Sequence, residues 1–200
     1  MMTLGLVIAL ALGVVFGRLD LLPVDQFPDS AVNIVLCFLV AAAGFMLASD
    51  DAFSRAMKQM RGSVLLVPLF AGIGSLAGGL LASAVTGVDL RAGLGIAGGF
   101  GWYTLSGLLV NGYAGAEAGA LAFLANLFRE ILALLLIPLV MRRPGGYFAA
   151  GMAGATAMDT TLPLLAEYGD PERTMTAFLS GVILSLAVPL WIPLVYGLMA

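Results

Sequence analysis

The sequence predicts an all-α integral membrane protein that crosses the bilayer several times. Hydrophobic residues make up 61% of the 200 residues and charged residues only 10%, whereas soluble domains carry about 25% charged residues. The apolar residues gather into seven stretches with short charged connections between them. About 20 apolar residues are enough to cross the hydrocarbon layer, so these stretches leave no room for a separate soluble domain. We therefore expect residues 1–200 to form a single transmembrane domain.

The seven apolar stretches differ in length and regularity. The first is short, lacks a preceding basic segment and a clear cleavage site, and is interpreted as a transmembrane helix instead of a signal peptide. Four glycines in the third predict close helix packing. The fifth and seventh are long enough to tilt, and two prolines are expected to kink the seventh. The stretches cover residues 2–17, 31–48, 62–87, 92–113, 115–141, 147–166 and 174–199.

The fourth and sixth stretches do not follow the pattern of continuous helices. Residues 98–107 and 154–163 combine glycines, and in the second case Pro163, with polar side chains. Glycine costs about 1 kcal/mol relative to alanine inside a helix, and proline lacks a backbone N–H. A pair of interrupted apolar segments is typical of transporter binding sites. The sequence thus predicts two discontinuous or re-entrant segments; the alternative is that the glycines only permit close packing.

The distribution of basic residues favours the re-entrant arrangement. If all seven stretches cross, four basic residues fall on each side and the positive-inside rule gives no orientation. If the fourth and sixth re-enter, Arg18 and Arg91 lie opposite the other six. This model has five full spans, two re-entrant hairpins, a cytoplasmic N-terminus and an external C-terminus. The alternative is seven crossings in a dimer of dual orientation. The six residues that would share one side are Arg55, Lys58, Arg61, Arg142, Arg143 and Arg173.

Two acids lie near the middle of apolar stretches, Glu130 in the fifth and Asp159 in the sixth. A carboxylate at the centre of a span costs roughly 3 kcal/mol on insertion scales, and such residues mark transport pathways, proton relays or counter-ions. We expect the two acids to form a cation site in which one is ionised while the other carries a proton. The alternative is a structural ion pair, such as Arg129 with Asp159.

Further polar residues complete the predicted site. Asn126 lies four positions before Glu130 and therefore shares its helix face. Arg129 is adjacent to Glu130 and points elsewhere; it is expected to pair with an acid, cap a helix contact or meet a substrate carboxylate. Serine and threonine in membrane helices often bond only their own backbone, so each hydroxyl carries a structural alternative. The remaining members are Gly99, Gly101, Trp102, Tyr103, Ser106, Thr156, Thr160 and Thr161.

The composition argues against several other functions. The chain has no histidine, which excludes His-based triads, zinc motifs and haem ligation. The single Cys37 cannot form an internal disulfide or a cysteine-only metal site. A net charge of −3 provides no basic patch for nucleic acid. An aspartic protease would need two aspartates that share a proton, and Asp159 is the only aspartate in a predicted span. We expect neither enzymatic activity nor a cofactor or bound metal.

Three motifs together resemble the LysO-type lysine exporters of bacteria and archaea. They are GFGWYTLSG at 99–107, NLFRE at 126–130 and GATAMDTTLP at 154–163, and the segment SGVILSLAVP at 180–189 agrees with them. The resemblance begins at about Gly5 and covers nearly the whole chain. It implies a multi-pass protein of the cytoplasmic membrane that exports L-lysine and close cationic analogues. It also implies that the intramembrane acids of the family correspond to Glu130 and Asp159.

Longer members of this family carry an additional N-terminal block of helices, and this chain begins after it. The resemblance therefore leads us to expect an oligomer. The simplest form is a homodimer, and the alternative is a small membrane subunit that supplies the additional helices.

The expected mechanism is alternating access around a site at mid-membrane. The ammonium groups of lysine would meet Glu130 and Asp159, and its carboxylate would meet backbone N–H groups near 99–101 or 156–159. Export of a cation against an inside-negative potential costs about 2.3 kcal/mol per charge per 100 mV. Proton influx can offset that cost, so we expect proton-coupled antiport. The alternative function is a passive cation or proton channel.

Overall fold

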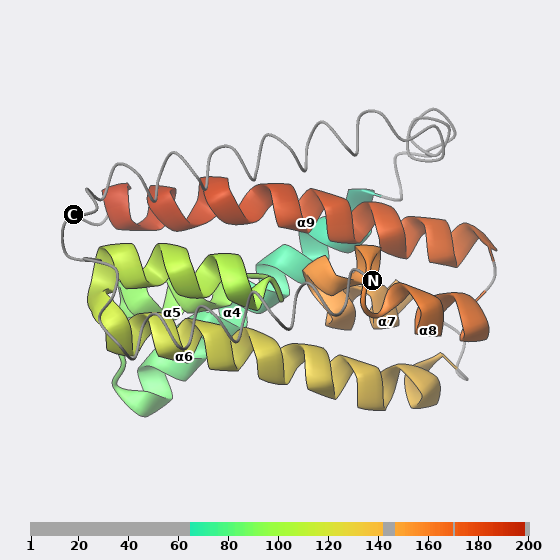
Figure 1. Cartoon of the computed structure of the whole chain (residues 1–200), viewed down its shortest axis with the longest axis horizontal. Helices are drawn as coiled ribbons and strands as arrows, with labels where there is room; N and C mark the ends of the chain where they lie inside the picture. The colour runs from blue at the N-terminus through green and yellow to red at the C-terminus, as the bar shows by residue number, and fades with distance from the viewer. Residues whose placement is uncertain (1–64, 142–146, 170, 199–200) are drawn as a thin grey trace, which may run out of the picture. The chain divides into compact units, whose positions relative to one another are not determined.

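The computed structural model describes residues 65–141, 147–169 and 171–198, all of which lie within one compact unit, Asp50–Ala200. These ranges are helical and contain no strand, which confirms the predicted all-α class for this part of the chain (Figure 1). The first two apolar stretches lie outside the described residues, so the prediction of a single domain over residues 1–200 stays a prediction. The elements are α4 (Leu66–Thr86), α5 (Leu90–Ala97), α6 (Tyr103–Val140), α7 (Tyr147–Ala153), the 3₁₀-helix η3 (Gly154–Met158), α8 (Leu162–Tyr168) and α9 (Pro171–Leu198).

Within the described ranges, three helices are long and apolar enough to cross a membrane: α4, α6 and the segment Glu172–Leu198 of α9. They arise from the third, fifth and seventh apolar stretches. Half of the most apolar window of α9 is buried inside the protein, compared with 17% for α4. α9 is therefore the more enclosed helix, while α4 exposes large apolar side chains such as Phe70 and Leu81. Exposed apolar helices of this length are typical of a multi-pass membrane protein.

The helix α6 consists of two parts that meet at Gly115. This residue has φ 86° and ψ 175°, a non-helical conformation that glycine adopts far more readily than other residues. The two parts pack closely side by side, because a Cβ atom on Gly107 would lie 3.3 Å from the carbonyl oxygen of Gly119. The predicted boundary between the fourth and fifth stretches thus falls at a real turn of the chain.

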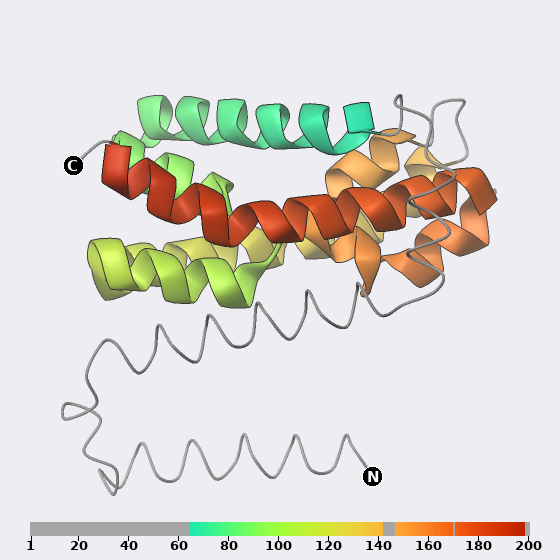
Figure 2. The same ribbon diagram turned by 90° about the horizontal axis from the view of Figure 1, so that it is seen from above.

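The two helix interruptions occur where the sequence predicted them. Helix α5 ends at Ala97 and regular helix resumes at Tyr103, while α7 gives way to η3 at Gly154 and helix resumes at Leu162. Each interruption forms the tip of a hairpin. We call α5 with the first part of α6 the first hairpin, and α7 with α8 the second hairpin. The two hairpins enter from opposite ends of this unit and meet at their tips (Figures 1 and 2).

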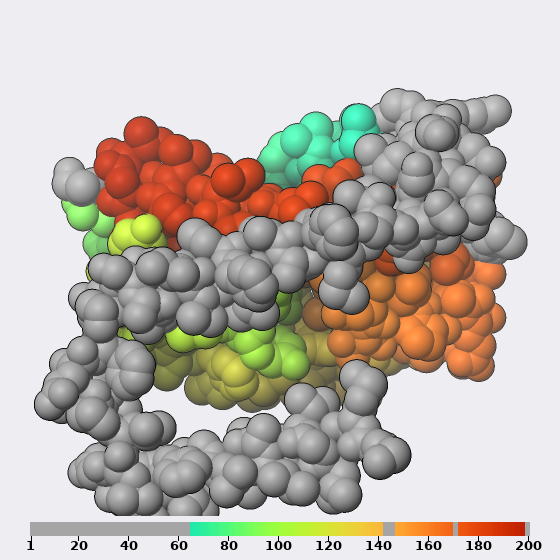
Figure 3. All heavy atoms as spheres, turned by 45° about the horizontal axis from the view of Figure 1, so that its top comes forward, coloured from blue at the N-terminus to red at the C-terminus, as the bar shows by residue number. Residues whose placement is uncertain are grey.

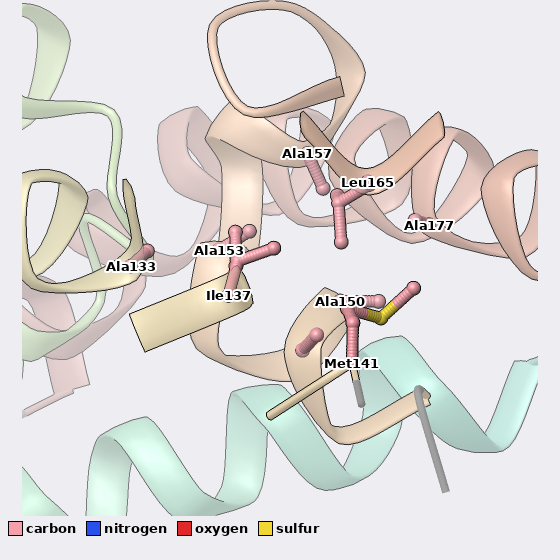
Figure 4. Packing of buried hydrophobic residues seen from close by; sticks show 9 residues of the cluster. Ala133, Ile137, Met141, Ala150, Ala153, Ala157, Leu165 and Ala177 are labelled. Atoms are coloured by element: carbon pink, nitrogen blue, oxygen red, sulfur yellow. The ribbon is translucent and has the colours of Figure 1, made fainter. Parts of the chain in front are cut away.

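The second hairpin packs on α6 and α9 through small side chains. Six of the nine residues in this buried cluster are alanines, which lets the helix backbones approach closely. A Cβ atom on Gly181 of α9 would lie 2.5 Å from the backbone nitrogen of Met158, so α9 lies directly against the backbone of η3. The second tip is therefore held by backbone packing. The cluster comprises Ala133, Ile137, Met141, Ala149, Ala150, Ala153, Ala157, Leu165 and Ala177 (Figure 4).

Two described basic residues lie at opposite ends of this helical unit. The guanidinium of Arg173, at the start of α9, lies 6.0 Å from the ring centre of Tyr147 at the start of α7. Figure 3 shows the orange second hairpin massed beside this part of the chain. Arg91 is in the first turn of α5, near the other end of α9, where Tyr196 packs against Gly95. Their separation agrees with the re-entrant model. The other basic residues of that model lie outside the described residues, and the orientation towards the cytoplasm stays a prediction.

Candidate functional site

The tips of the two hairpins contact each other through their backbones. The N–H of Ala155 donates to the carbonyl oxygen of Phe100 at 2.8 Å. Three residues at the contact have left-handed backbone conformations: Phe100 with φ 47°, Gly101 with φ 106° and Gly154 with φ 65°. A Cβ atom on Gly154 would overlap the Phe100 carbonyl oxygen. The glycines are thus required by both conformation and space, and buried Phe100 adopts a conformation that is unfavourable for a residue with a side chain.

Asn126 holds the first tip from the side. Its Oδ1 accepts the N–H of Gly101 at 2.8 Å, and its Nδ2 lies 2.9 Å from the carbonyl oxygen of Ile96 and 3.2 Å from Ser106 Oγ. The amide therefore satisfies backbone groups that the helix break leaves without helical partners. A Cβ atom on Gly99 would overlap Asn126 Nδ2. Asn126, Gly99, Gly101 and Ser106, all predicted as site residues, together form the structural support of this tip.

Arg129 holds the second tip and makes no ion pair with a carboxylate in the described part of the chain. Its Nε donates to the carbonyl oxygen of Met152 at 3.1 Å, and its Nη2 donates to that of Gly151 at 3.0 Å. Its Nη1 donates to Ser75 Oγ on α4 at 3.0 Å. The alternative of an Arg129–Asp159 ion pair is therefore wrong for this structure. Of the predicted roles, the arginine fulfils that of a helix cap.

A cavity of about 210 Å³ opens where the two tips meet. Both tips and α9 contribute to its wall, and Asp159 supplies the one carboxylate among its lining residues. Asp159 is exposed, and its Oδ1 accepts the N–H of Thr160. Six of the predicted site residues therefore meet around one space. The lining residues are Gly101, Trp102, Tyr103, Thr104, Ala155, Thr156, Met158, Asp159, Thr160 and Ser185.

The N-terminal end of α6 lies at the same cavity. Trp102 precedes the helix and makes no side-chain cap to its first turn, whose first two residues, Tyr103 and Thr104, line the cavity. The start of a helix carries a partial positive charge and open N–H groups. The cavity thus combines the carboxylate of Asp159 with a helix terminus suited to an anion. A small zwitterion with an additional positive charge matches this combination.

Glu130 lies on the buried face of α6, outside the cavity that contains Asp159. It is 6% exposed, and its Oε2 is buried without a hydrogen-bond partner among the described residues. One turn earlier Asn126 contacts the first tip, and nearly one turn later Ala133 packs in the cluster beneath the second hairpin. Glu130 thus lies between the contacts of the two tips. A buried, unpartnered carboxylate oxygen is costly unless a proton or a cation binds to it.

The remaining predicted residues make local contacts. Thr156 Oγ1 donates to the carbonyl oxygen of Ala153, and Thr161 Oγ1 donates to that of Thr156, both at 3.0 Å. These hydroxyls therefore bond the backbone of their own tip, as the structural alternative predicted. The ring of Tyr103 packs edge-to-face on Phe123, with ring centres 5.3 Å apart.

Sequence reasoning missed three contributors to the site. The carbonyl of Phe100 makes the contact between the tips, and the glycines on either side of this residue were the signal that could have identified it. Ser75 on α4 and Ser185 on α9 reach the site only through tertiary packing, so nothing in the local sequence marks them. No group of histidine, cysteine, aspartate and glutamate side chains suited to a metal occurs in the described ranges.

Comparisons with known proteins agree with the resemblance seen in the motifs. The family model described as Lysine exporter LysO matches residues 7–196. A protein from Escherichia coli named Lysine exporter LysO is 35% identical over 168 residues, which cover 84% of this chain and 55% of that protein. A protein from Haemophilus influenzae, whose name also refers to lysine export, is 33% identical over 184 residues, which cover 91% of this chain and 92% of that protein. The chain thus spans about half of the first relative and nearly all of the second. No solved structure matches the chain.

Proposed function

Because the chain belongs to the LysO family of lysine exporters, we propose that it exports L-lysine across the cytoplasmic membrane. The observation that carries this proposal is the cavity between the tips, which places Asp159 and the start of α6 around one space. Its volume of about 210 Å³ is below the ~300–1,000 Å³ of pockets for drug-sized ligands. A cavity of this size suits a small metabolite such as a single amino acid.

The cavity offers a partner for each part of lysine. The carboxylate of Asp159 would bind an ammonium group, and the start of α6 would receive the substrate carboxylate. Trp102, Ala155 and Met158 provide apolar surface for the methylene groups of the side chain. Ornithine and arginine share the same charges, so close cationic analogues are included in the proposal.

Glu130 would couple export to protons. A buried carboxyl group between the contacts of the two tips can hold either a proton or a cation, but it is not stable there as an unpartnered ion. Proton influx would then offset the cost of exporting a cation, about 2.3 kcal/mol per charge per 100 mV. Movement of one hairpin relative to the other would expose the cavity alternately to the two sides. The contact of Ala155 with Phe100 is the bond that such a movement would alter.

We also propose that the protein acts as an oligomer, most simply a homodimer; a small membrane subunit is the alternative. Helix α4 supports an assembly because Gly74 and Gly78 are exposed, four residues apart, with open space where a Cβ atom would lie. Small residues at this spacing let helices from two chains approach closely in a membrane. Gly79, in contrast, packs against Gly93 and Ala97 within the chain, which confirms the prediction of close packing for that glycine.

The function is tested by counterflow of labelled lysine in liposomes that contain the purified protein. An exporter with alternating access concentrates labelled lysine against its gradient when unlabelled lysine is preloaded, and the uptake saturates. A passive channel gives flux without counterflow. Absence of lysine counterflow in liposomes with folded protein would contradict the proposal.

A further inference from the structure

Arg129 connects the C-terminal ends of the two entering half-helices. It binds the last turn of α7 directly, through the carbonyl oxygens of Gly151 and Met152. It reaches the end of α5 through Ser75, whose Oγ accepts from Arg129 Nη1 and donates to the carbonyl oxygen of Ala97 at 2.8 Å. A single side chain of α6 thus joins α4, α5 and α7 beside both tips.

These acceptors need a donor because the helices stop there. In a continuous helix the carbonyl of Gly151 would accept the N–H of Ala155, but that N–H donates to Phe100 across the tip contact. The guanidinium replaces the missing donor. Formation of the contact between the tips and binding of Arg129 to α7 are therefore parts of one hydrogen-bond arrangement.

The charge of Arg129 is balanced by neutral oxygens. In the described part of the chain its partners are two carbonyl groups and one hydroxyl group, and no carboxylate pairs with it. The C-terminal end of a helix carries up to about half a negative elementary charge, so two such ends together favour one cation. Backbone and hydroxyl oxygens at helix C-termini are also the ligands with which transporters that have discontinuous helices coordinate Na⁺.

We propose that Arg129 is a permanent resident cation that takes the place of a coupling sodium ion at these half-helix ends. It follows that export by this protein does not require Na⁺ and that the charge of Arg129, beyond its volume, keeps the tips in a transport-competent arrangement. This inference rests on the proposed export function. Arg129 acts here as a positioning residue, because none of its contacts lies in the cavity that contains Asp159.

The surroundings of Arg129 permit a direct test by chemical rescue. Cavities of about 420 and 490 Å³ flank the side chain, and both are lined by Arg129 and Ser75. Truncation to alanine would leave the three oxygen acceptors beside open space. A small cation added to the solution could then reach the position of the guanidinium group.

The experiment compares lysine counterflow of wild-type protein, Arg129→Ala and Arg129→Met in Na⁺ and in choline media. Wild-type counterflow should be equal in the two media. We expect Arg129→Ala to lose at least about tenfold, the scale expected when hydrogen bonds to a charged group are removed, and millimolar guanidinium or Na⁺ to restore part of it. Arg129→Met fills the space without charge and should not be restored. Arg91→Ala removes an exposed arginine and is the matched control.

A second readout does not depend on transport. Millimolar guanidinium should raise the melting temperature of Arg129→Ala but not that of wild-type protein or Arg129→Met. If wild-type protein gave no lysine counterflow, the proposed function would fail while this thermal response still decided the role of Arg129.

Three results would overturn the inference. They are a requirement of wild-type transport for Na⁺, wild-type counterflow by Arg129→Met, and folded Arg129→Ala that responds to neither cation. If Arg129→Ala does not fold, Arg129→Lys decides: more counterflow than Arg129→Met supports a role for the charge, and equal loss in both variants contradicts it.

Discussion

The N–H of Ala155 donates to the carbonyl oxygen of Phe100 at 2.8 Å, and this bond joins two helix interruptions that are far apart in the chain. The structure around the bond serves to make it possible. Gly101 and Gly154 supply left-handed backbone, while Asn126 and Arg129 satisfy the polar groups that the interruptions release. The contact also forms one side of the cavity to which we assign lysine. Tests of the account therefore centre on this contact and on the charges near it.

Substitution of Gly154 by alanine should destabilise the protein. Its φ of 65° is strained for alanine, and the new methyl group would overlap the Phe100 carbonyl oxygen and crowd the Arg129 guanidinium. We expect a loss of about 1–3 kcal/mol in stability, measured as a lower melting temperature, together with reduced lysine counterflow. Gly197→Ala, at an exposed position with open space, is the control and should melt like the wild type. Equal melting of the two variants would contradict the described contact.

Substitution of Asn126 by alanine should weaken the first tip. The N–H of Gly101 and the carbonyl of Ile96 would lose their side-chain partner in a buried environment. An unsatisfied buried polar group costs about 1–3 kcal/mol, so the variant should melt at a lower temperature. Asn111→Ala removes an exposed amide of the same size and should have little effect. Wild-type stability of Asn126→Ala would show that the amide does not support the tip.

Lysinamide should compete poorly with lysine. It keeps both ammonium groups but lacks the carboxylate that we assign to the start of α6. Charge interactions with a helix N-terminus are worth about 0.3–2 kcal/mol. The half-inhibitory concentration for labelled lysine uptake should therefore be a few-fold to about thirtyfold higher for lysinamide than for lysine. Equal inhibition by the two compounds would rule out recognition of the carboxylate.

Substitution of Glu130 by glutamine should separate exchange from proton-driven transport. The amide matches the carboxyl group in size, but it cannot bind and release a proton. We expect lysine counterflow to persist and acceleration by an imposed pH gradient to disappear, as measured in the same liposomes. Glu117→Gln, at an exposed position of α6, should keep the response to pH. Proton-driven transport by Glu130→Gln at the wild-type rate would remove Glu130 from the coupling mechanism.

The sequence predicted the helix interruptions because their cause is local. Glycines at 98–101 and at 154, and Pro163, disfavour a continuous helix wherever they occur, and the structure interrupts the helices at these positions. The all-α class followed in the same way from apolar stretches of membrane-spanning length. Periodicity also identified the face of α6 that carries Asn126 and Glu130, both of which are buried.

The relation between the two acids could not be predicted from the sequence. Both lie near the centre of an apolar stretch, and we expected them to form one cation site. The structure places Asp159 at an exposed position in the cavity and Glu130 on the buried face of α6. Which way a helix break turns its side chains depends on tertiary contacts such as that of Ala155 with Phe100. The role of Arg129 was equally hidden, because its acceptors belong to distant parts of the chain.

The most direct test of the central claim is the concentration dependence of lysine counterflow by Asp159→Asn. Asp159 is exposed and makes only a local hydrogen bond, so the variant should melt like the wild type. Loss of a charge-assisted hydrogen bond costs about 1.5–3 kcal/mol, which predicts a half-saturating lysine concentration about 10–150 times higher than that of the wild type. A folded Asp159→Asn protein that saturates at the wild-type lysine concentration would contradict the assignment of lysine to the cavity between the tips.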